Sequence, residues 1–151
     1  MSAPERASVA ESVVRMRAHY AEVDRMGFLH HSNHLRWFER GREEFCRRRG
    51  AVYRELEDAG VLVVVADLEV AYRSPIRYEE LADLTVALRA VGHASLVFEY
   101  ALRRVEDGAL AATGRTRHAF VTREGRVTRV GHDVARRLSG PELETRLGEL
   151  G

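Results

Sequence analysis

The sequence has 151 residues, 45% of them apolar and 31% charged, which suffices for one domain with a packed core and argues against a disordered chain. Its 24 basic residues, all of them arginine, nearly balance 23 acidic residues and leave a net charge of +1, so the chain lacks the strong positive field of a dedicated nucleic-acid-binding protein. A single cysteine excludes a disulfide framework, and the longest apolar run, residues 61–66, is too short to span a membrane.

The first predicted elements are a flexible N-terminus over residues 1–11, without an apolar signal core, and a strand over residues 12–20. Apolar and polar residues alternate in that strand, as they do in a half-buried strand. Because the sequence shows neither the apolar core of a signal peptide nor a membrane-spanning segment, we expect a cytoplasmic protein.

A long helix follows the strand after a loop. We expect it to begin at Ser32 or Asn33, which are both good N-caps, and to end at Arg49, before Gly50. Gly41 lies in its middle, where glycine costs about 1 kcal/mol relative to alanine. Close contact with a sheet or a partner helix would compensate for that cost.

The rest of the chain is predicted to be mostly strand. A short helix over residues 51–59 precedes the predicted strands, which cover residues 61–73, 84–91, 95–105 and 109–122, with a short extension over 126–130. Two short helices, over 132–138 and 141–147, make a peripheral tail of residues 131–151. One strand, a long helix and then four strands in a meander predict a single α+β domain over residues 1–151, with an antiparallel sheet of about five strands wrapped around the helix.

The densest chemical signal lies where the first strand gives way to the helix. Asp24 leaves the strand, Gly27 permits a tight loop, and the helix begins near His31. The free N–H groups of a helix N-terminus can polarise a carbonyl and hold a developing oxyanion. A carboxylate beside them could attack that carbonyl or activate water. The pattern indicates acyl transfer or hydrolysis, although an aspartate before a helix is also typical of a turn.

The block from residue 20 to residue 39, Tyr-x-x-x-Asp-x-x-Gly-x-x-x-His-x-Asn-x-x-x-Trp-Phe-Glu, resembles the signature of hotdog-fold acyl-CoA thioesterases of the 4-hydroxybenzoyl-CoA thioesterase and YbgC type. The resemblance covers residues 12–130 and includes segments 72–78 and 92–95. It implies hydrolysis of an acyl-CoA or acyl-carrier thioester to a free acid and a thiol, with no cofactor besides the coenzyme A of the substrate. It also implies a homodimer or homotetramer whose active site lies between two protomers.

The same resemblance assigns roles to individual residues. Asp24 would be the nucleophile or the general base, and the backbone N–H of His31 would polarise the thioester carbonyl, with the side chains of His31 and Tyr20 assisting. Substrate contacts would come from Gly27, His30, Asn33, Trp37, His93 and Ser95. The chain departs from the family pattern at Glu22, where many relatives carry aspartate.

Three other functions compete with this hypothesis. The first is metal binding by the cluster of His30, His31 and His34, in which His30 and His34 have the i, i+4 spacing of a helical zinc-binding pair. The cluster does not form an HExxH pattern and no third ligand can be assigned, so we expect no metal. A non-catalytic module that binds or senses acyl-thioesters would not need the retained Asp24. The arginines of residues 36–49 alternate with glutamates, which favours a solvated mixed-charge helix face over nucleic-acid binding.

Overall fold

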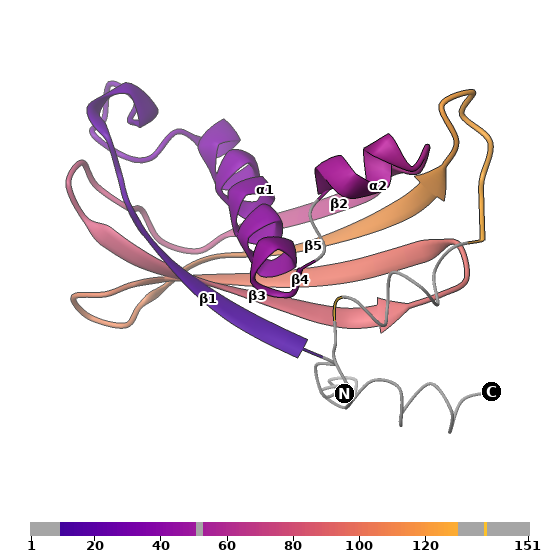
Figure 1. Cartoon of the computed structure of the whole chain (residues 1–151). Coiled ribbons are helices and arrows are strands. Elements are labelled where there is room, and N and C mark those ends of the chain that lie inside the picture. The colour runs from indigo at the N-terminus through magenta and orange to yellow at the C-terminus, as the bar shows by residue number, and fades with distance from the viewer. Residues whose placement is uncertain (1–9, 51–52, 130–137, 139–151) are drawn as a thin grey trace, which may run out of the picture.

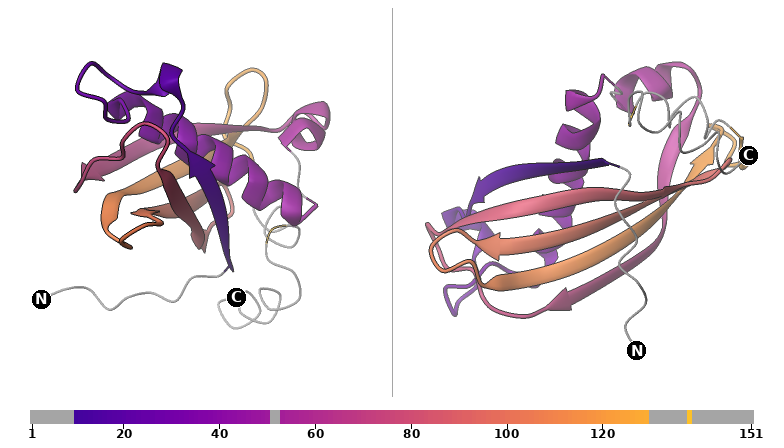
Figure 2. Two further views of the ribbon diagram at one scale, coloured as in Figure 1. Left: turned by 90° about the vertical axis from the view of Figure 1, so that its left-hand side faces the viewer. Right: turned by 90° about the horizontal axis from the view of Figure 1, so that it is seen from below.

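A computed structural model describes residues 10–50, 53–129 and Leu138. The elements in chain order are β1 (Ala10–Arg17), the 3-10 turn η1 (Tyr20–Glu22), α1 (His31–Arg48), α2 (Tyr53–Asp58), β2 (Leu62–Tyr72), β3 (Leu81–Val91), β4 (Ser95–Arg104) and β5 (Leu110–Val121). All five strands join one antiparallel sheet, and α1 packs across one of its faces (Figures 1 and 2). The predicted α+β architecture, a five-stranded antiparallel sheet around one long helix, is confirmed.

The order of the strands differs from the predicted meander. Only β3, β4 and β5 pair in chain order, because β2 pairs with β5 and β1 pairs with β3, giving the order β1-β3-β4-β5-β2. The connection after β2 explains the difference. Instead of turning back on β2, it runs beside the loop before α1, where Leu29 N–H donates to Ile76 O at 2.6 Å. This path leaves β2 as an edge strand.

Several element ends differ from those predicted. β1 begins at Ala10, so residues 10–11 belong to the sheet, and it ends at Arg17 because the chain then forms η1. β3 begins three residues early, at Leu81, which pairs with Arg17. The N-cap of α1 is His30 instead of Ser32 or Asn33.

The other predicted strands agree with the structure to within one residue at each end. Only one isolated bridge, between Val121 and Val127, is found in the described part of the predicted extension. The predicted helices over 132–138 and 141–147 lie outside the described residues, except for Leu138, which is buried in the core.

Gly41 lets α1 approach the sheet closely. A Cβ atom at this position would lie 2.5 Å from Leu84 Cδ2 and 2.8 Å from Val86 Cγ2, both on β3. These methyl groups belong to fully buried side chains, so they have little room to move. The expected compensation for a glycine in mid-helix is therefore a contact with the sheet.

We expect Gly41→Ala to lower the free energy of unfolding measured in urea. Overpacking a core costs about 1–3 kcal/mol, and contacts this short belong to the upper part of that range, above the roughly 1 kcal/mol that alanine gains over glycine in helix propensity. Arg40→Ala, on the exposed side of the same helix, is the control and should change stability little. An unchanged urea midpoint for Gly41→Ala would show that the Leu84 and Val86 side chains can move to make room for the methyl group.

A chain of buried polar groups runs from α1 into the sheet. Arg42 donates from Nε to Tyr53 Oη at 3.1 Å and from Nη1 to Tyr100 Oη at 3.0 Å. Tyr100 Oη lies 2.7 Å from Thr116 Oγ1, which in turn lies 2.8 Å from His118 Nε2. Arg42 therefore faces the core, although in sequence it is one of the arginines assigned to a solvated face. Burial, together with the positive charge of Arg42, lowers the pKa of His118 to about 3.

Acid should destabilise the fold through His118. Its pKa in the unfolded chain is about 6.5, so below that pH the unfolded state binds a proton that the folded state excludes. The contribution of His118 to the free energy of unfolding is fully present above about pH 6.5. It falls by about 1.4 kcal/mol per pH unit as the pH is lowered toward 3. We expect urea unfolding between pH 7.5 and 5 to show at least this slope, and His118→Gln to reduce it, leaving the part that comes from His34, whose pKa burial also lowers. The same slope in both proteins would contradict the assignment to His118.

Candidate active site

Asp24 lies in a short β-hairpin between η1 and α1. Its backbone N–H donates to Phe28 O at 2.8 Å, and the N–H of Gly27 donates to Asp24 O at 3.0 Å. The N–H of His30 closes the other end on Glu22 O at 2.9 Å. Gly27 has a φ of 81°, the left-handed conformation that a three-residue hairpin loop requires at this position. The sequence therefore fixes the turn through Asp24 at its start and Gly27 at its end.

This hairpin is fastened to the rest of the protein on its returning side. Phe28 forms a bridge with Arg77, and the N–H of Tyr78 donates to Gly27 O at 3.2 Å. The guanidinium of Arg77 also lies over the Phe28 ring, 5.3 Å from its centre. Because the hairpin ends at His30, the N-cap of α1, the position of Asp24 relative to the helix N-terminus is set by backbone pairing. In the hairpin Asp24 lies opposite Phe28. Phe28 precedes His30 by two residues, which is about 7 Å along the strand.

The two carboxylate oxygens of Asp24 have different environments. Oδ1 accepts from the N–H of Met26 at 2.8 Å and from the N–H of Phe28 at 3.3 Å, an arrangement that stabilises the turn. Oδ2 accepts no hydrogen bond from any residue that the structure describes, and the side chain is only half-buried. One oxygen therefore holds the loop, and the other is available for chemistry.

The N-terminus of α1 has one uncommitted donor in its first turn. The N–H of Ser32 donates to His30 Nδ1 at 3.2 Å, and that of Asn33 donates to His30 O at 2.8 Å. The N–H of His31, the first residue of the helix, has no acceptor within the described ranges. Helix N-termini carry a partial positive charge, so this group is suited to polarising a carbonyl oxygen.

The side chains of the three histidines near this point have different tasks. His30 caps the helix through Nδ1, which also lies 2.8 Å from Ser32 Oγ, so its predicted substrate contact competes with capping. His31 is exposed, and its ring lies 4.1 Å from that of His30. His34 is buried, which lowers its pKa, and its Nδ1 is the one buried side-chain nitrogen or oxygen in the described structure without a hydrogen bond.

Tyr20 lies in η1 instead of at a strand end. Its side chain is 80% exposed and meets the ring of Tyr78 edge to face, with 5.8 Å between ring centres. Within the described part of the chain, no hydrogen bond links its hydroxyl to Asp24 or His31. The predicted assisting role of Tyr20 therefore has no hydrogen bond within the described residues to support it.

Asn33 and Trp37 converge on Glu22, which the sequence marks only as a departure from the family pattern. Asn33 Nδ2 donates to Glu22 O at 2.7 Å, and Trp37 Nε1 donates to Glu22 Oε2 at 2.7 Å. Both residues are buried. The structure therefore shows them holding the hairpin against α1. No periodic pattern in the sequence indicates a contact between residues 22 and 37, so sequence reasoning missed Glu22.

His93 and Ser95 lie at the other end of the molecule. They belong to the turn and the first residue of β4, beyond the end of β3. The start of β3 pairs with Arg17, near the candidate site, and the 11 residues of β3 span about 35 Å. The structure does not bring these two residues to Asp24 within one chain.

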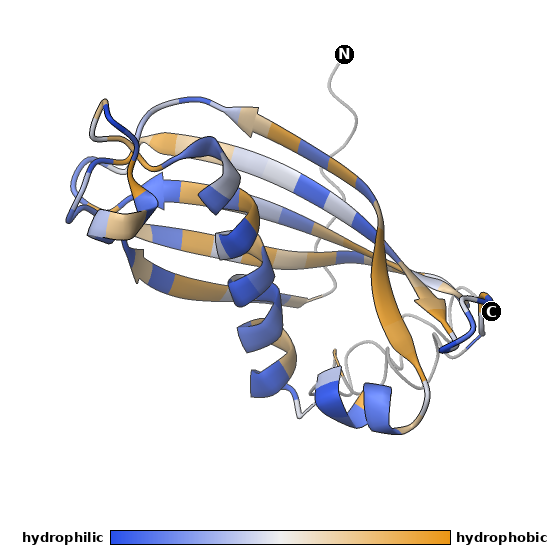
Figure 3. Ribbon diagram, turned by 90° about the horizontal axis from the view of Figure 1, so that it is seen from above, coloured by the Kyte–Doolittle hydropathy of each residue, from blue (hydrophilic) through white to orange (hydrophobic). Residues whose placement is uncertain are grey.

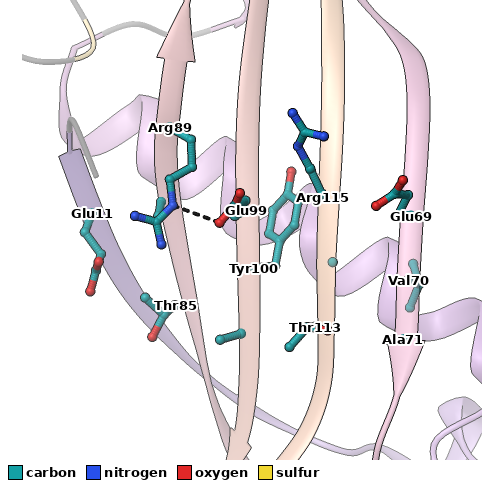
Figure 4. A pocket seen from close by; sticks show the side chains of 13 residues that line it. Glu11, Glu69, Val70, Ala71, Thr85, Arg89, Glu99, Tyr100, Thr113 and Arg115 are labelled. Atoms are coloured by element: carbon teal, nitrogen blue, oxygen red, sulfur yellow. Dashed lines mark hydrogen bonds and ion pairs between the residues drawn. The ribbon is translucent and has the colours of Figure 1, made fainter. Parts of the chain in front are cut away.

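The open face of the sheet carries a separate hollow of about 480 Å³. Figure 4 shows it lined by side chains of both charges from neighbouring strands, among them Arg89 and Glu99, whose Nε and Oε2 atoms are 2.9 Å apart. None of the predicted site residues lines it. It lies on the face of the sheet away from α1 and is therefore separate from the candidate site.

Metal binding, thiol chemistry and membrane insertion each require groups of a particular kind. The described ranges contain no group of three His, Cys, Asp or Glu side chains placed to hold a metal ion. Burial raises the pKa of the Cys46 thiol to about 11, so it is protonated at neutral pH and unsuited to nucleophilic attack. Among the helices in the described part of the chain, none combines the length and apolar character needed to cross a membrane.

Comparison with known proteins gives a consistent result. Residues 18–138 match the model of the thioesterase-like superfamily. The chain is 25% identical over 95 residues to the acyl-CoA thioester hydrolase YbgC of Escherichia coli O6:H1, covering 63% of this chain and 71% of that protein. A DHNA-CoA thioesterase from Staphylococcus aureus has a similar structure, with a TM-score of 0.77, 26% identity and coverage of 93% of this chain and 90% of the other. The hypothetical protein TT1821 from Thermus thermophilus gives a TM-score of 0.78 at 35% identity, covering 86% and 96%.

Proposed function

The chain belongs to the thioesterase-like superfamily and is a thioester hydrolase, and on this premise we propose that it hydrolyses an acyl-CoA or acyl-carrier thioester to a free acid and a thiol. The names of its relatives support an acyl-CoA substrate. One observation carries the assignment of the site. An uncommitted carboxylate oxygen of Asp24 lies on a hairpin that leads directly into α1, whose first residue, His31, has an uncommitted N–H.

In this proposal the His31 N–H binds the carbonyl oxygen of the thioester. It is positioned before the reaction and carries the partial charge of the helix, so it stabilises the oxyanion that forms when the carbonyl carbon is attacked. Asp24 supplies the attack in one of two ways. Its Oδ2 adds to the carbonyl carbon and expels the thiolate, and water then hydrolyses the resulting anhydride, or Oδ2 takes a proton from a water molecule that attacks directly.

We also propose that the active unit is a homodimer formed through β2. This edge strand exposes four large apolar side chains, those of Val64, Val65, Leu68 and Tyr72, and Figure 3 shows apolar colouring over much of it. Val65, Leu68 and Tyr72 share one face of the sheet. Their register partners on β5 lie beneath α1, so the exposed side chains project from the helix side of the sheet. Unpaired apolar edge strands favour association with a further strand.

Two-fold pairing of β2 with its copy would be antiparallel and would set opposite ends of the two protomers side by side. The turn that carries His93 and Ser95 in one protomer would then lie on the same side as Asp24 of the other. This arrangement supports their expected role in substrate binding, which one chain alone does not explain.

Thiol release from short, medium, long and aromatic acyl-CoA esters tests the proposed function. We expect turnover of at least one ester class by the purified protein, without added metal or cofactor. Binding without turnover would instead support the alternative of a module that senses acyl-thioesters. Neither binding nor turnover with any ester would reject an acyl-CoA substrate.

A further inference from the structure

We propose that Glu22 is a positioning residue for the hydrolysis, because it locks the hairpin that carries Asp24 onto the first turns of α1. This inference rests on the proposed function. Four hydrogen bonds end on Glu22, two at its backbone carbonyl and two at its carboxylate. They join this one residue to η1, to the helix N-cap and to the helix itself.

The backbone carbonyl of Glu22 fixes the start of α1. It accepts from the N–H of His30 at 2.9 Å and from Asn33 Nδ2 at 2.7 Å. These contacts place the N-cap and the first turn of the helix at a defined distance from the outgoing side of the hairpin. The N–H of His31 lies between the two donors in sequence, so its direction depends on both.

The carboxylate of Glu22 fixes the outgoing side of the hairpin. Oε2 accepts from Trp37 Nε1 at 2.7 Å, and Oε1 accepts from the N–H of His19 at 3.0 Å. Trp37 is fully buried in the core, so it is a firm anchor. Glu22 itself is largely shielded, with a side chain only 19% exposed. Asp24 follows two residues later, and any shift of Glu22 moves it.

The N–H groups of His19 and of the Trp37 indole each donate to a different oxygen of the Glu22 side chain. Only a carboxylate offers two acceptor oxygens at this position. A glutamine at this position has one oxygen and one NH₂ group. Whichever way its amide turns, one donor, either the indole or the His19 N–H, faces another donor. Glu22→Gln therefore keeps the size of the side chain but removes one of the two hydrogen bonds that the carboxylate accepts.

We expect Glu22→Gln to lower kcat by about tenfold to a hundredfold, because misplacing a catalytic group by about 1 Å costs up to about a hundredfold. KM should change by less than about threefold, since the residue is not placed against the substrate. Glu44→Gln is the matched control. Glu44 forms exposed ion pairs with Arg47 and Arg48 on the same helix, and its loss should leave kcat unchanged.

A double-variant cycle separates positioning from a purely structural role. Trp37→Phe removes the indole N–H, so the oxygen of a glutamine at position 22 is then free for His19. The double variant should have the kcat of Trp37→Phe alone, within about twofold, instead of the product of both losses. Thermal unfolding of all variants identifies any loss of folded protein, and kcat is expressed per folded chain.

The outcomes are distinct. Loss of kcat in Glu22→Gln together with non-additivity in the double variant supports the inference. Losses that multiply, or a Glu22→Gln variant whose kcat is within about threefold of an active wild type, overturn it and leave the proposed function intact. A wild-type protein that hydrolyses no ester in the panel overturns both. A fall in stability alone, with kcat per folded chain unchanged, assigns Glu22 a structural role and also overturns it.

Discussion

Asp24→Asn should reduce kcat for the best acyl-CoA ester by at least about a hundredfold while the protein stays folded. General-base assistance is worth about 10²–10⁴-fold, and an amide is neither a base at neutral pH nor an effective nucleophile. The structure explains why folding should survive. An asparagine Oδ1 can still accept from Met26 and Phe28, so only the uncommitted oxygen is replaced. KM should change less than kcat, because the loss falls mainly in the transition state.

Two further variants locate the effect. Asp24→Ala should lose at least as much activity, and it should also loosen the hairpin, because the turn loses its side-chain acceptor. His31→Ala should lose less, because the backbone N–H survives the substitution. Steady-state kinetics with circular dichroism as the check on folding measures all three. A folded Asp24→Asn protein that retained activity within about threefold of wild type, far less than a general base contributes, would remove Asp24 from the mechanism.

The parts of this site that the sequence predicted are those built from local signals. Gly27 permits the turn, Asp24 begins it, and the change of hydrophobic period places the helix start within two residues of His31. The identity of the cap was missed, because an imidazole is not among the preferred N-capping side chains. The overall architecture followed from the order of elements, whose boundaries are marked by glycine and proline.

Non-local contacts were beyond sequence reasoning. The position of β2 at the sheet edge depends on where residues 73–80 run, and that path is set by pairing with the hairpin instead of by a turn motif. The contact between Glu22 and Trp37 depends on the same hairpin. Arg42 faces the core, yet in sequence it is indistinguishable from its exposed neighbours. A list of motif residues also carries no information on distance, so His93 and Ser95 were grouped with a site at the other end of the sheet.

Leu68→Glu should convert the proposed dimer to monomers and lower activity per chain by more than about tenfold. Leu68 is 44% exposed on β2, one residue from the middle of the strand, so two-fold pairing brings it close to its own copy. Burying two unpaired carboxylates there costs several kcal/mol for each ion. Tyr72, on the same strand, donates its hydroxyl to His31 O at 2.7 Å. Loss of the pairing therefore disturbs the first turn of α1 and removes the partner's share of the site.

The other edge of the sheet offers a matched control. Val13 on β1 is 48% exposed, and its register partner is Thr85, on the open face. Val13→Glu introduces the same charge at an edge-strand position of similar exposure, but away from the proposed interface. Sedimentation equilibrium and thiol-release assays should show a dimer with full activity for Val13→Glu and an inactive monomer for Leu68→Glu. A fully active wild-type monomer would exclude an active site shared between protomers. A dimer mass for Leu68→Glu would place the interface elsewhere, because Leu68 lies at the centre of the interface only if the protomers pair through β2.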